Sequence, residues 1–333
     1  MARGGAQQAD LFGDEPALRV PTAPIDAAVR ALAAQLPAHV RLGTSSWTFP
    51  GWEGLVYARA ERVERLARDG LAAYACHPLL RAVGLDRTFY APITTAQFAE
   101  YARAVPPDFR FLVKAAAAVT TPGGLARTRS GSGMDHFLDA AWAATHVVEP
   151  AVNGLGDRLG VLLFQFPPLA PGSAALASLP ARLGAFLRKL PRGVPYAVEV
   201  RNAELLSTAH AEAYVAALAG AGATHGFTVH PTMPPLPEQA ERLGPAAWDG
   251  GPVAVRWMLQ RDQRYEQARD AWAPFRELAA PDPATRTDVA ALVEAVAAGH
   301  RPVLVIANNK AEGSAPRTVH ELARLLGARA GFG

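Results

Sequence analysis

One short segment of the chain places an acid and a base side by side. Residues 196–202 read Tyr-Ala-Val-Glu-Val-Arg-Asn. The segment is rich in β-branched and apolar residues and follows Pro195, which is typical of a buried β-strand. Because side chains alternate along a strand, Glu199 and Arg201 share one face and lie about 6.6 Å apart along it. Buried charges rarely lack a partner. The pair therefore either fixes packing as an ion pair or marks the mouth of a functional site.

Other polar side chains occupy an equivalent place on other predicted strands. Each strand is apolar in its body and polar at its carboxyl end. The strand-end residues are Trp47, Asp86, Lys114, Gln165, Glu199, Arg201, His230, Arg256, Asn308 and Asn309. In a parallel barrel these ends meet on one face, where the loops build the active site. We therefore expect a polar pocket on that face.

The cations of this set indicate what the pocket would bind. Lys114, Arg201 and Arg256 suit a phosphate or carboxylate, and arginine can bind either group through two parallel hydrogen bonds. Asn309 and Ser314 precede a predicted helix, whose N-terminus favours an anion. Aromatic residues near the strand ends either stack on a sugar or base or pack at the rim. The predicted substrate-binding residues are Trp47, Tyr90, Gln165, Arg201, Arg256, Asn308, Asn309 and Ser314.

Four residues are candidates for catalysis. Glu199 is the best general base, although Arg201 should keep its carboxyl ionised and its pKa low. Lys114, Asp86 and His230 complete the set. A single divalent metal bound by Glu199, His230 and Asp86 is an alternative. The histidines show no His-Glu-x-x-His or His-x-His spacing, so we predict no metal and no cofactor.

The elements that must position these residues alternate along the chain. Strands are predicted at 40–47, 79–86, 109–115, 157–166, 196–202, 223–229, 252–259 and 301–309. Helices are predicted at 25–36, 61–76, 94–104, 135–153, 174–190, 208–220, 286–298 and 317–327. A loop is predicted at 116–134, a Pro-rich connector at 231–237 followed by a polar segment to 251, and a partly helical insertion at 260–283. This alternation predicts a (β/α)8 barrel of TIM type, regular or irregular, forming a single domain over residues 40–327. An open doubly wound sheet is the alternative, but no strand precedes a Gly-x-Gly-x-x-Gly segment.

Composition narrows the class of protein. The chain has 333 residues, of which 50% are hydrophobic and 19% charged, as in globular domains. A net charge of +3 is too small to argue nucleic-acid binding by itself. Cys76 is the only cysteine, so no intrachain disulfide can form, which fits a reducing cytoplasm. No apolar run of about 18 residues is present, so no membrane span is expected.

The N-terminal region, residues 1–39, is predicted to lie outside the barrel. Residues 1–24 lack periodicity and predict a disordered tail, followed by a short helix. The tail contains Gln8-Ala9-Asp10-Leu11-Phe12, which is similar to the motif by which many bacterial replication and repair proteins bind the sliding clamp. Leu11 and Phe12 would fill a pocket, with Gln8 as a polar contact and Asp10 completing the motif. Chance occurrence in a low-complexity tail is the alternative.

The strand ends also carry a family resemblance. The motifs are Gly43-Thr-Ser-Ser-Trp-Thr-Phe-Pro-Gly-Trp52, Thr88-Phe-Tyr90, Phe111-x-x-Lys114, Leu163-x-Gln-x-Pro-Pro168, Ala197-Val-Glu-Val-Arg201, Val255-Arg256 and Asn308-Asn-x-x-x-Gly-x-Ala315. Over residues 40–327 and in this order they resemble the YecE-like family, the domain of unknown function numbered 72. The resemblance implies a TIM-type barrel with a polar pocket formed by these residues. It implies no reaction, because none is established for the family.

This chain departs from the family pattern at two positions. Gly84 stands where the family usually has a glutamate, and Met258 stands where it usually has a histidine. Both changes remove an ionisable group from the pocket rim. They argue against a mechanism that needs two carboxylates, and they are compatible with an altered or lost activity.

Three functional hypotheses follow. The first is an enzyme, a hydrolase or a lyase, that acts on a phosphate-containing or otherwise anionic small molecule. The second is a nucleic-acid-processing barrel similar to endonuclease IV, tethered to the sliding clamp by its tail, although the multi-zinc ligand cluster of that type is absent from the sequence. The third is a binding module without catalysis.

Overall fold

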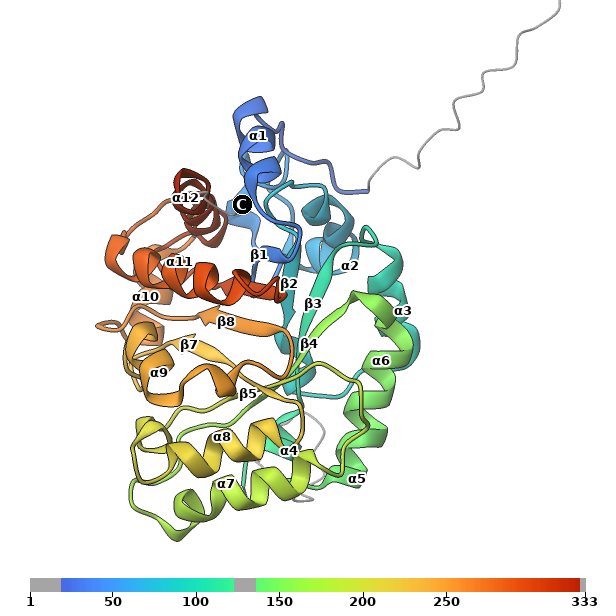
Figure 1. Ribbon diagram of the computed structural model, residues 1–333. Coiled ribbons are helices and arrows are strands. Elements are labelled where there is room, and N and C mark those ends of the chain that lie inside the picture. Colours follow the sequence, from blue (N-terminus) through green and yellow to red (C-terminus); the bar gives the residue numbers. More distant parts are fainter. Residues whose placement is uncertain (1–18, 123–135, 330–333) are drawn as a thin grey trace, which may run out of the picture.

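The strands form one parallel sheet that curves into a barrel (Figure 1). The computed structural model describes residues 19–122 and 136–329. The strands are β1 (Val40–Thr44), β2 (Ala82–Leu85), β3 (Arg110–Lys114), β4 (Leu159–Gln165), β5 (Tyr196–Glu199), β6 (Thr224–His225), β7 (Phe227–Val229), β8 (Val253–Trp257) and β9 (Val303–Ala307). Over the described ranges their order in the sheet is β6-β5-β4-β3-β2-β1-β9-β8-β7. The predicted α/β barrel is confirmed.

The barrel closes where one predicted strand is split in two. β6 and β7 lie in the segment predicted as a single strand, and only Gly226 separates them. β6 pairs with β5 and β7 pairs with β8, so the two edges of the sheet meet and the barrel is nearly closed. The N–H of Gly226 donates to the Val198 carbonyl at 2.8 Å. A Cβ at this position would lie 3.0 Å from Leu163 Cδ1, so glycine permits the close approach.

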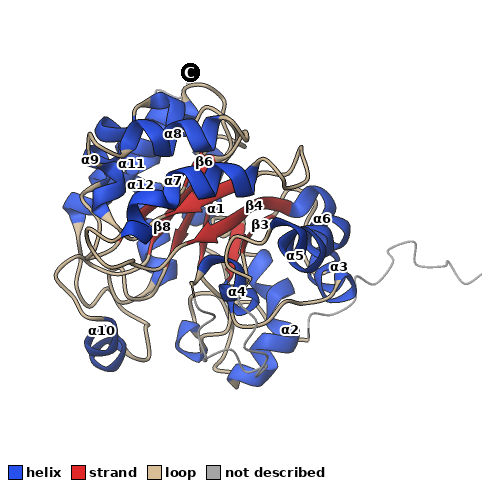
Figure 2. Ribbon diagram, turned by 90° about the horizontal axis from the view of Figure 1, so that it is seen from below, coloured by secondary structure: helices blue, strands red, loops and turns tan. Residues whose placement is uncertain are grey.

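Helices cover the outside of the barrel (Figure 2). They are α1 (Ala27–Gln35), α2 (Val63–Ala75), α3 (Thr95–Arg103), α4 (Ala117–Thr120), α5 (Ala140–Ala143), α6 (Glu149–Leu155), α7 (Ala174–Leu187), α8 (Ala211–Ala219), α9 (Leu236–Leu243), α10 (Tyr265–Trp272), α11 (Pro283–Ala297) and α12 (Ala315–Ala328). A helix of this kind buries one apolar face against the barrel. In α2 that face contains Leu66, Leu71 and Tyr74, which recur at helical spacing. Within the described ranges, no helix is long and apolar enough to cross a lipid bilayer.

The hydrophobic core has two parts. A small inner cluster fills the barrel and consists of Ala82, Leu112, Val161, Leu163, Ala197, Ala254, Leu304 and Ile306. A larger outer cluster lies between the strands and the helices. The inner cluster comes from β2, β3, β4, β5, β8 and β9, whose intervening residues point outward, since successive side chains of a strand point to opposite faces. The inner cluster is wholly apolar, and the charged side chains Lys114, Glu199 and Arg256 lie toward the carboxyl ends of their strands.

Several elements differ from the sequence-based prediction. The connector after β7 contains a helix, α9, whose buried residues Leu236, Gln239 and Leu243 mark one face. The helix predicted at 135–153 is interrupted by a π-helical turn at Ala144–Val148, just before Pro150. Proline has no N–H to donate to the preceding turn, which explains the interruption. α4 begins inside the predicted loop at 116–134, whereas the insertion at 260–283 is partly helical, as predicted.

The predicted disordered tail ends earlier than residue 24. Val20 is fully buried and Ala23 is 2% exposed. Thr22 forms an antiparallel bridge with Tyr57, and the N–H of Ala23 donates to the Val56 carbonyl at 3.0 Å. The prediction of disorder is therefore wrong for residues 19–24, which we call the strap. The buried side chains of Val20 and Ala23 and the backbone contacts with residues 56–57 hold the strap against the loop after β1. The motif at residues 8–12 lies outside the described residues.

Candidate functional site

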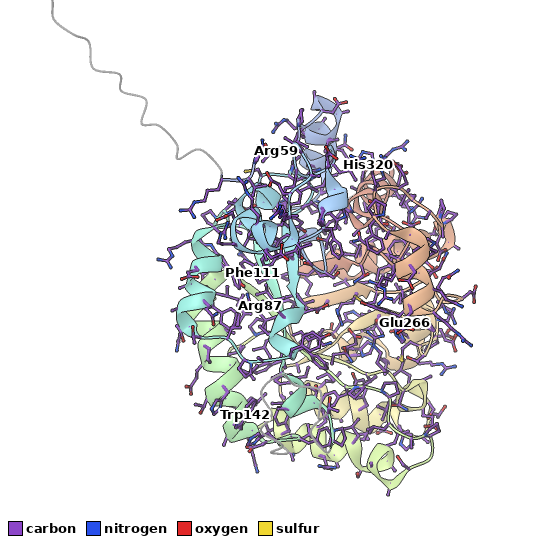
Figure 3. The ribbon with its side chains drawn as sticks, turned by 180° about the vertical axis from the view of Figure 1, so that it is seen from behind. Arg59, Arg87, Phe111, Trp142, Glu266 and His320 are labelled. Atoms are coloured by element: carbon purple, nitrogen blue, oxygen red, sulfur yellow. The ribbon has the colours of Figure 1, made fainter. Side chains whose placement is uncertain are left out.

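The polar strand ends meet on one face of the barrel. Glu199 ends β5 beside Gln165, the last residue of β4, and Lys114 ends β3. Glu199 is fully buried. Gly226 packs closely against it, since a Cβ at position 226 would lie only 3.3 Å from the Cβ of Glu199. Figure 3 shows Arg87, in the turn after β2, and Glu266, on α10, on opposite sides of the molecule.

An ion-pair network occupies the centre of this face. Glu199 accepts hydrogen bonds from Arg201 at one carboxylate oxygen and from Arg256 Nη1, at 2.9 Å, at the other. Arg256 also reaches Asp86, with Nη2 3.3 Å from Oδ1. Arg256 is 2% exposed and Arg201 8%, whereas the Asp86 side chain is 35% exposed. The network therefore runs from Arg201 to the buried carboxylate of Glu199, and from there through Arg256 to Asp86, a carboxylate that solvent can reach.

The environment of Glu199 keeps it ionised. Burial alone would raise the pKa of this carboxyl, but the charges of Arg201 and Arg256 outweigh burial and lower the pKa to about 2. The predicted low pKa is thus borne out in direction. Burial alone would likewise lower the pKa of Arg256, and its two carboxylate partners raise it instead. A carboxylate this acidic is a weak proton acceptor at neutral pH, so Glu199 serves better to position the two guanidinium groups.

Lys114 is the third cation of the site. Its ammonium lies 3.6 Å from the centre of the Phe89 ring. Thr88, the neighbour of Phe89, holds this arrangement because its hydroxyl donates to the Lys114 carbonyl at 2.6 Å. Burial, with the opposing effects of Asp86 and Arg256, lowers the pKa of Lys114 to about 8. About 10% of this amine is therefore unprotonated at pH 7, far more than for an ordinary lysine.

His230 lies within electrostatic reach of the same network. Burial and then the charge of Arg201 lower the pKa of its imidazole to about 4, so the ring is neutral at pH 7. The N–H of Thr232 donates to His230 Nδ1 at 3.3 Å, which leaves Nε2 to carry the proton. Over the described ranges, no group of three or more His, Cys, Asp or Glu side chains is arranged to hold a metal ion.

A second polar group lies at the end of β9. Asn308 Nδ2 donates to Ser45 Oγ at 2.8 Å, and Asn308 Oδ1 lies 3.5 Å from the ammonium of Lys310. The Lys310 ammonium also lies 4.1 Å from the centre of the Tyr265 ring on α10 and 5.6 Å from that of Phe275. Burial and then Arg269 lower the pKa of Lys310 to about 8. The sequence analysis did not include Lys310 among the candidate site residues. Its position directly after Asn308-Asn309, at the end of the last predicted strand, could have indicated it.

Two predicted anion-binding residues are buried in packing instead. Asn309 and Ser314 are fully buried. Asn309 Oδ1 accepts from the indole N–H of Trp52 at 3.2 Å and from the N–H of Ala315 at 2.8 Å, which ties the strand end to the first turn of α12. At Gly313, with φ +112°, a Cβ would lie 2.5 Å from the Glu277 carbonyl oxygen. The insertion at 260–283 thus covers the segment before α12. This geometry supports a structural role for Asn309 and Ser314.

The three remaining predicted residues differ in their surroundings. Trp47 is 5% exposed, and its indole N–H donates to the Leu66 carbonyl of α2 at 2.9 Å, which supports the rim-packing interpretation. Tyr90 is 59% exposed and lies free to contact a ligand. Gln165 is half-buried beside Glu199. The structure thus brings Asp86, Lys114, Glu199, Arg201, His230 and Arg256 together and places Asn308 in the neighbouring group with Lys310.

Comparisons with known proteins agree with this architecture. The family described as "Protein of unknown function DUF72" matches residues 41–332. A DUF72 family protein from Enterococcus faecalis V583 aligns with a TM-score of 0.60 at 19% identity, over 86% of this chain and 95% of that one. A DUF72 family protein from Thermotoga maritima MSB8 aligns with a TM-score of 0.56 at 20% identity, over 86% of this chain and 98% of the other. No curated protein matches the chain.

The two solved structures, at this level of identity, establish the barrel fold and nothing finer. The family match covers most of the chain and includes every strand-end motif from Thr44 to Ala315, and the YecE-like family is the same family. On these grounds, the chain belongs to the DUF72 family of proteins of unknown function.

Proposed function

We propose that this chain is an enzyme that acts on a phosphorylated or otherwise anionic small molecule. The molecule would bind where β3, β5 and β8 end. The observation that carries the proposal is the charge of the network. Three cations, Lys114, Arg201 and Arg256, face two carboxylates, Asp86 and Glu199, which leaves one positive charge in excess. Charge that is buried without compensation is costly, and a bound anion would remove that cost.

The exposure and charge of each residue suggest its role in binding, positioning or proton transfer. Arg201 is 8% exposed at the edge of the network, and together with half-buried Lys114 it can meet an incoming phosphate or carboxylate. Glu199 would hold the guanidinium groups in place. Proton transfer would fall to His230, which is neutral at pH 7, and to the partly exposed Asp86. These roles fit a hydrolase or a lyase acting on a phosphate-containing substrate.

Ligand-induced stabilisation tests this proposal. We expect a panel of small phosphate esters to contain members that raise the melting temperature of the wild type, because binding to the native state stabilises it. Arg201→Ala should remove this shift by those esters, since it deletes the guanidinium at the rim of the network. The measurement is the difference in melting temperature with and without ester, so any loss of intrinsic stability cancels.

Arg192→Ala is the matched control, since it removes an exposed arginine at the opposite end of β5 and should leave the shift unchanged. An ester shift that survives Arg201→Ala in full would contradict the proposed site. Binding of an ester without any turnover, across hydrolysis and cleavage assays, would favour the third hypothesis, a binding module.

A second candidate function is nucleic-acid processing at the sliding clamp. The observation that favours it is the strap at residues 19–24, which is anchored to the barrel, with Arg19 paired to Asp69 at 3.3 Å. Phe12 of the clamp-like motif is seven residues before this anchor. An extended chain of that length spans at most about 25 Å, so a clamp bound there would lie close to the barrel.

We expect this candidate to be decided by binding of the full chain to a bacterial sliding clamp. If the motif is used, the wild type should bind and Leu11→Ala combined with Phe12→Ala should lose at least about 2 kcal/mol of binding free energy, as for anchor residues in general. Replacing Gln7, just outside the motif, with Ala is the control. Equal binding by the double variant, or no binding by the wild type, would remove this candidate.

A further inference from the structure

We infer that Lys114 is a nucleophilic amine, which forms an imine with an aldehyde or ketone group of the bound anion. This inference rests on the proposed function, because the arginine network would hold the anionic part of the same molecule. It names the substrate class as a carbonyl compound that carries a phosphate or carboxylate. Three features of the site lead to it.

The first feature is that the other charged groups of the site are already paired. Both oxygens of Glu199 accept from arginines, and Asp86 accepts from Arg256. Over residues 19–122 and 136–329, the Lys114 ammonium has no carboxylate within ion-pair distance and no hydrogen-bond acceptor. Its amine is therefore the polar group of this network that can turn toward a ligand.

The second feature is the wall against which the amine lies. Phe89 presents its ring face to the nitrogen at 3.6 Å, and Thr88 fixes the turn that carries this ring. Such an apolar surface, with the cations Arg201 and Arg256 nearby, disfavours the protonated form of a lysine. Desolvation and neighbouring cations are the two means by which proteins activate lysine as a nucleophile toward carbonyl groups.

The third feature is exposure. Within the described residues Lys114 is half-buried and the Asp86 side chain is 35% exposed, so this part of the network is the part nearest to solvent. Lys310 offers a useful contrast within the same barrel. Its amine has a pKa lowered to the same value, about 8, but it is 4% exposed and is held by Asn308 between two aromatic rings. Among the described residues, the Lys310 side chain is thus enclosed, whereas Lys114 is partly exposed.

The reaction balances with groups that are present. The unprotonated nitrogen of Lys114 attacks the carbonyl carbon, a C–N bond forms, and the carbonyl π electrons move to oxygen, which takes up a proton. The resulting carbinolamine loses this oxygen as water, and the two hydrogens of the water derive from the amine. The imine that remains can accept electrons when a neighbouring C–C or C–H bond breaks, which favours a lyase over a hydrolase.

Borohydride trapping tests this inference, because the chain has only three lysines, Lys114, Lys189 and Lys310. The full-length protein is treated with glycolaldehyde phosphate and borohydride at pH 7, and the reduced adduct is located by peptide mass spectrometry. An ordinary lysine, with a pKa near 10.4, is unprotonated to only about 0.04% at this pH, against about 10% for a pKa of 8. We expect labelling of Lys114 to exceed that of exposed Lys189 by at least about tenfold.

Two variants make the result specific. Lys114→Arg should abolish the fast adduct, because a guanidinium offers no nucleophilic amine. Lys310→Arg is the matched control and should keep the adduct. Labelling that is equal at all three lysines, or that is fastest at Lys310 or persists in Lys114→Arg, would overturn the inference.

The outcomes also separate the inference from the proposed function. Ester stabilisation without an adduct at Lys114 would leave the anion site standing and overturn the imine. Fast labelling of Lys114 by glycolaldehyde and glycolaldehyde phosphate alike, without stabilisation by any ester, would support the amine and overturn the anion site.

Discussion

Replacing Glu199 with leucine should lower the free energy of unfolding by about 3–5 kcal/mol, the usual cost of breaking a buried ion pair by removing one partner. The fully buried carboxylate is the counter-charge of two arginines that are themselves 8% and 2% exposed. Without it, Arg201 and Arg256 remain buried next to each other, and only the more distant Asp86 opposes their charge. Chemical denaturation at pH 7, compared with the wild type, measures the effect.

Glu238→Leu is the control for this prediction. Glu238 pairs with Arg242 on the exposed face of α9, and both side chains are about 40% exposed. Surface pairs of this kind contribute about 0–1 kcal/mol, so this variant should stay close to the wild type. A Glu199→Leu protein as stable as the Glu238→Leu protein would show that the network does not need its central carboxylate.

The pH dependence of the same variant carries further information. The folded pKa of Glu199, about 2, lies below its ordinary value of 4.5, so its stabilising contribution is fully present above pH 4.5 and is lost as pH falls through 2. The shift corresponds to about 3 kcal/mol. The stability difference between wild type and Glu199→Leu should therefore shrink between pH 4.5 and pH 2. A difference that stays constant over this range would contradict a lowered pKa.

Replacing Gly43 with alanine should prevent the barrel from folding or cost about 3 kcal/mol or more, the upper end of overpacking effects. Gly43 lies in β1 and pairs with Ala82 of β2. A Cβ there would lie 1.9 Å from the Ala82 carbonyl oxygen and 2.4 Å from its carbon, which are backbone atoms that cannot rotate away. The two strands would have to separate, and β2 leads directly to Asp86.

Gly251→Ala is the matched control, because the nearest atoms to a Cβ at that position lie 4.0 Å away. Soluble yield and thermal unfolding of the two variants are the measurements. We expect Gly251→Ala to behave as the wild type. A Gly43→Ala protein that folds with wild-type stability would show that β1 and β2 can move apart without cost.

The sequence was sufficient for most of the fold. Strand bodies such as Leu162–Phe164 are continuous apolar runs, which is what a parallel strand covered on both faces requires. The polar residues at the carboxyl ends of the strands, among them Lys114 and Glu199, then meet on one face because the barrel is parallel. α9 was missed because its polar surface outweighs three buried residues, and a local pattern cannot show that the barrel wall covers them.

The sequence also identified Glu199 and Arg201 as a pair, because residues two apart on a strand share a face regardless of the rest of the fold. The tertiary structure decided everything that depends on distant residues. It paired Glu199 with Arg256, 57 residues away, and Arg256 with Asp86, 170 residues away. It buried Lys310 against Tyr265 and Phe275 of the insertion and placed the half-buried Lys114 against the ring of Phe89. Spacing along a strand is a local property, whereas burial, pairing and pKa depend on which strand ends the closed barrel brings together.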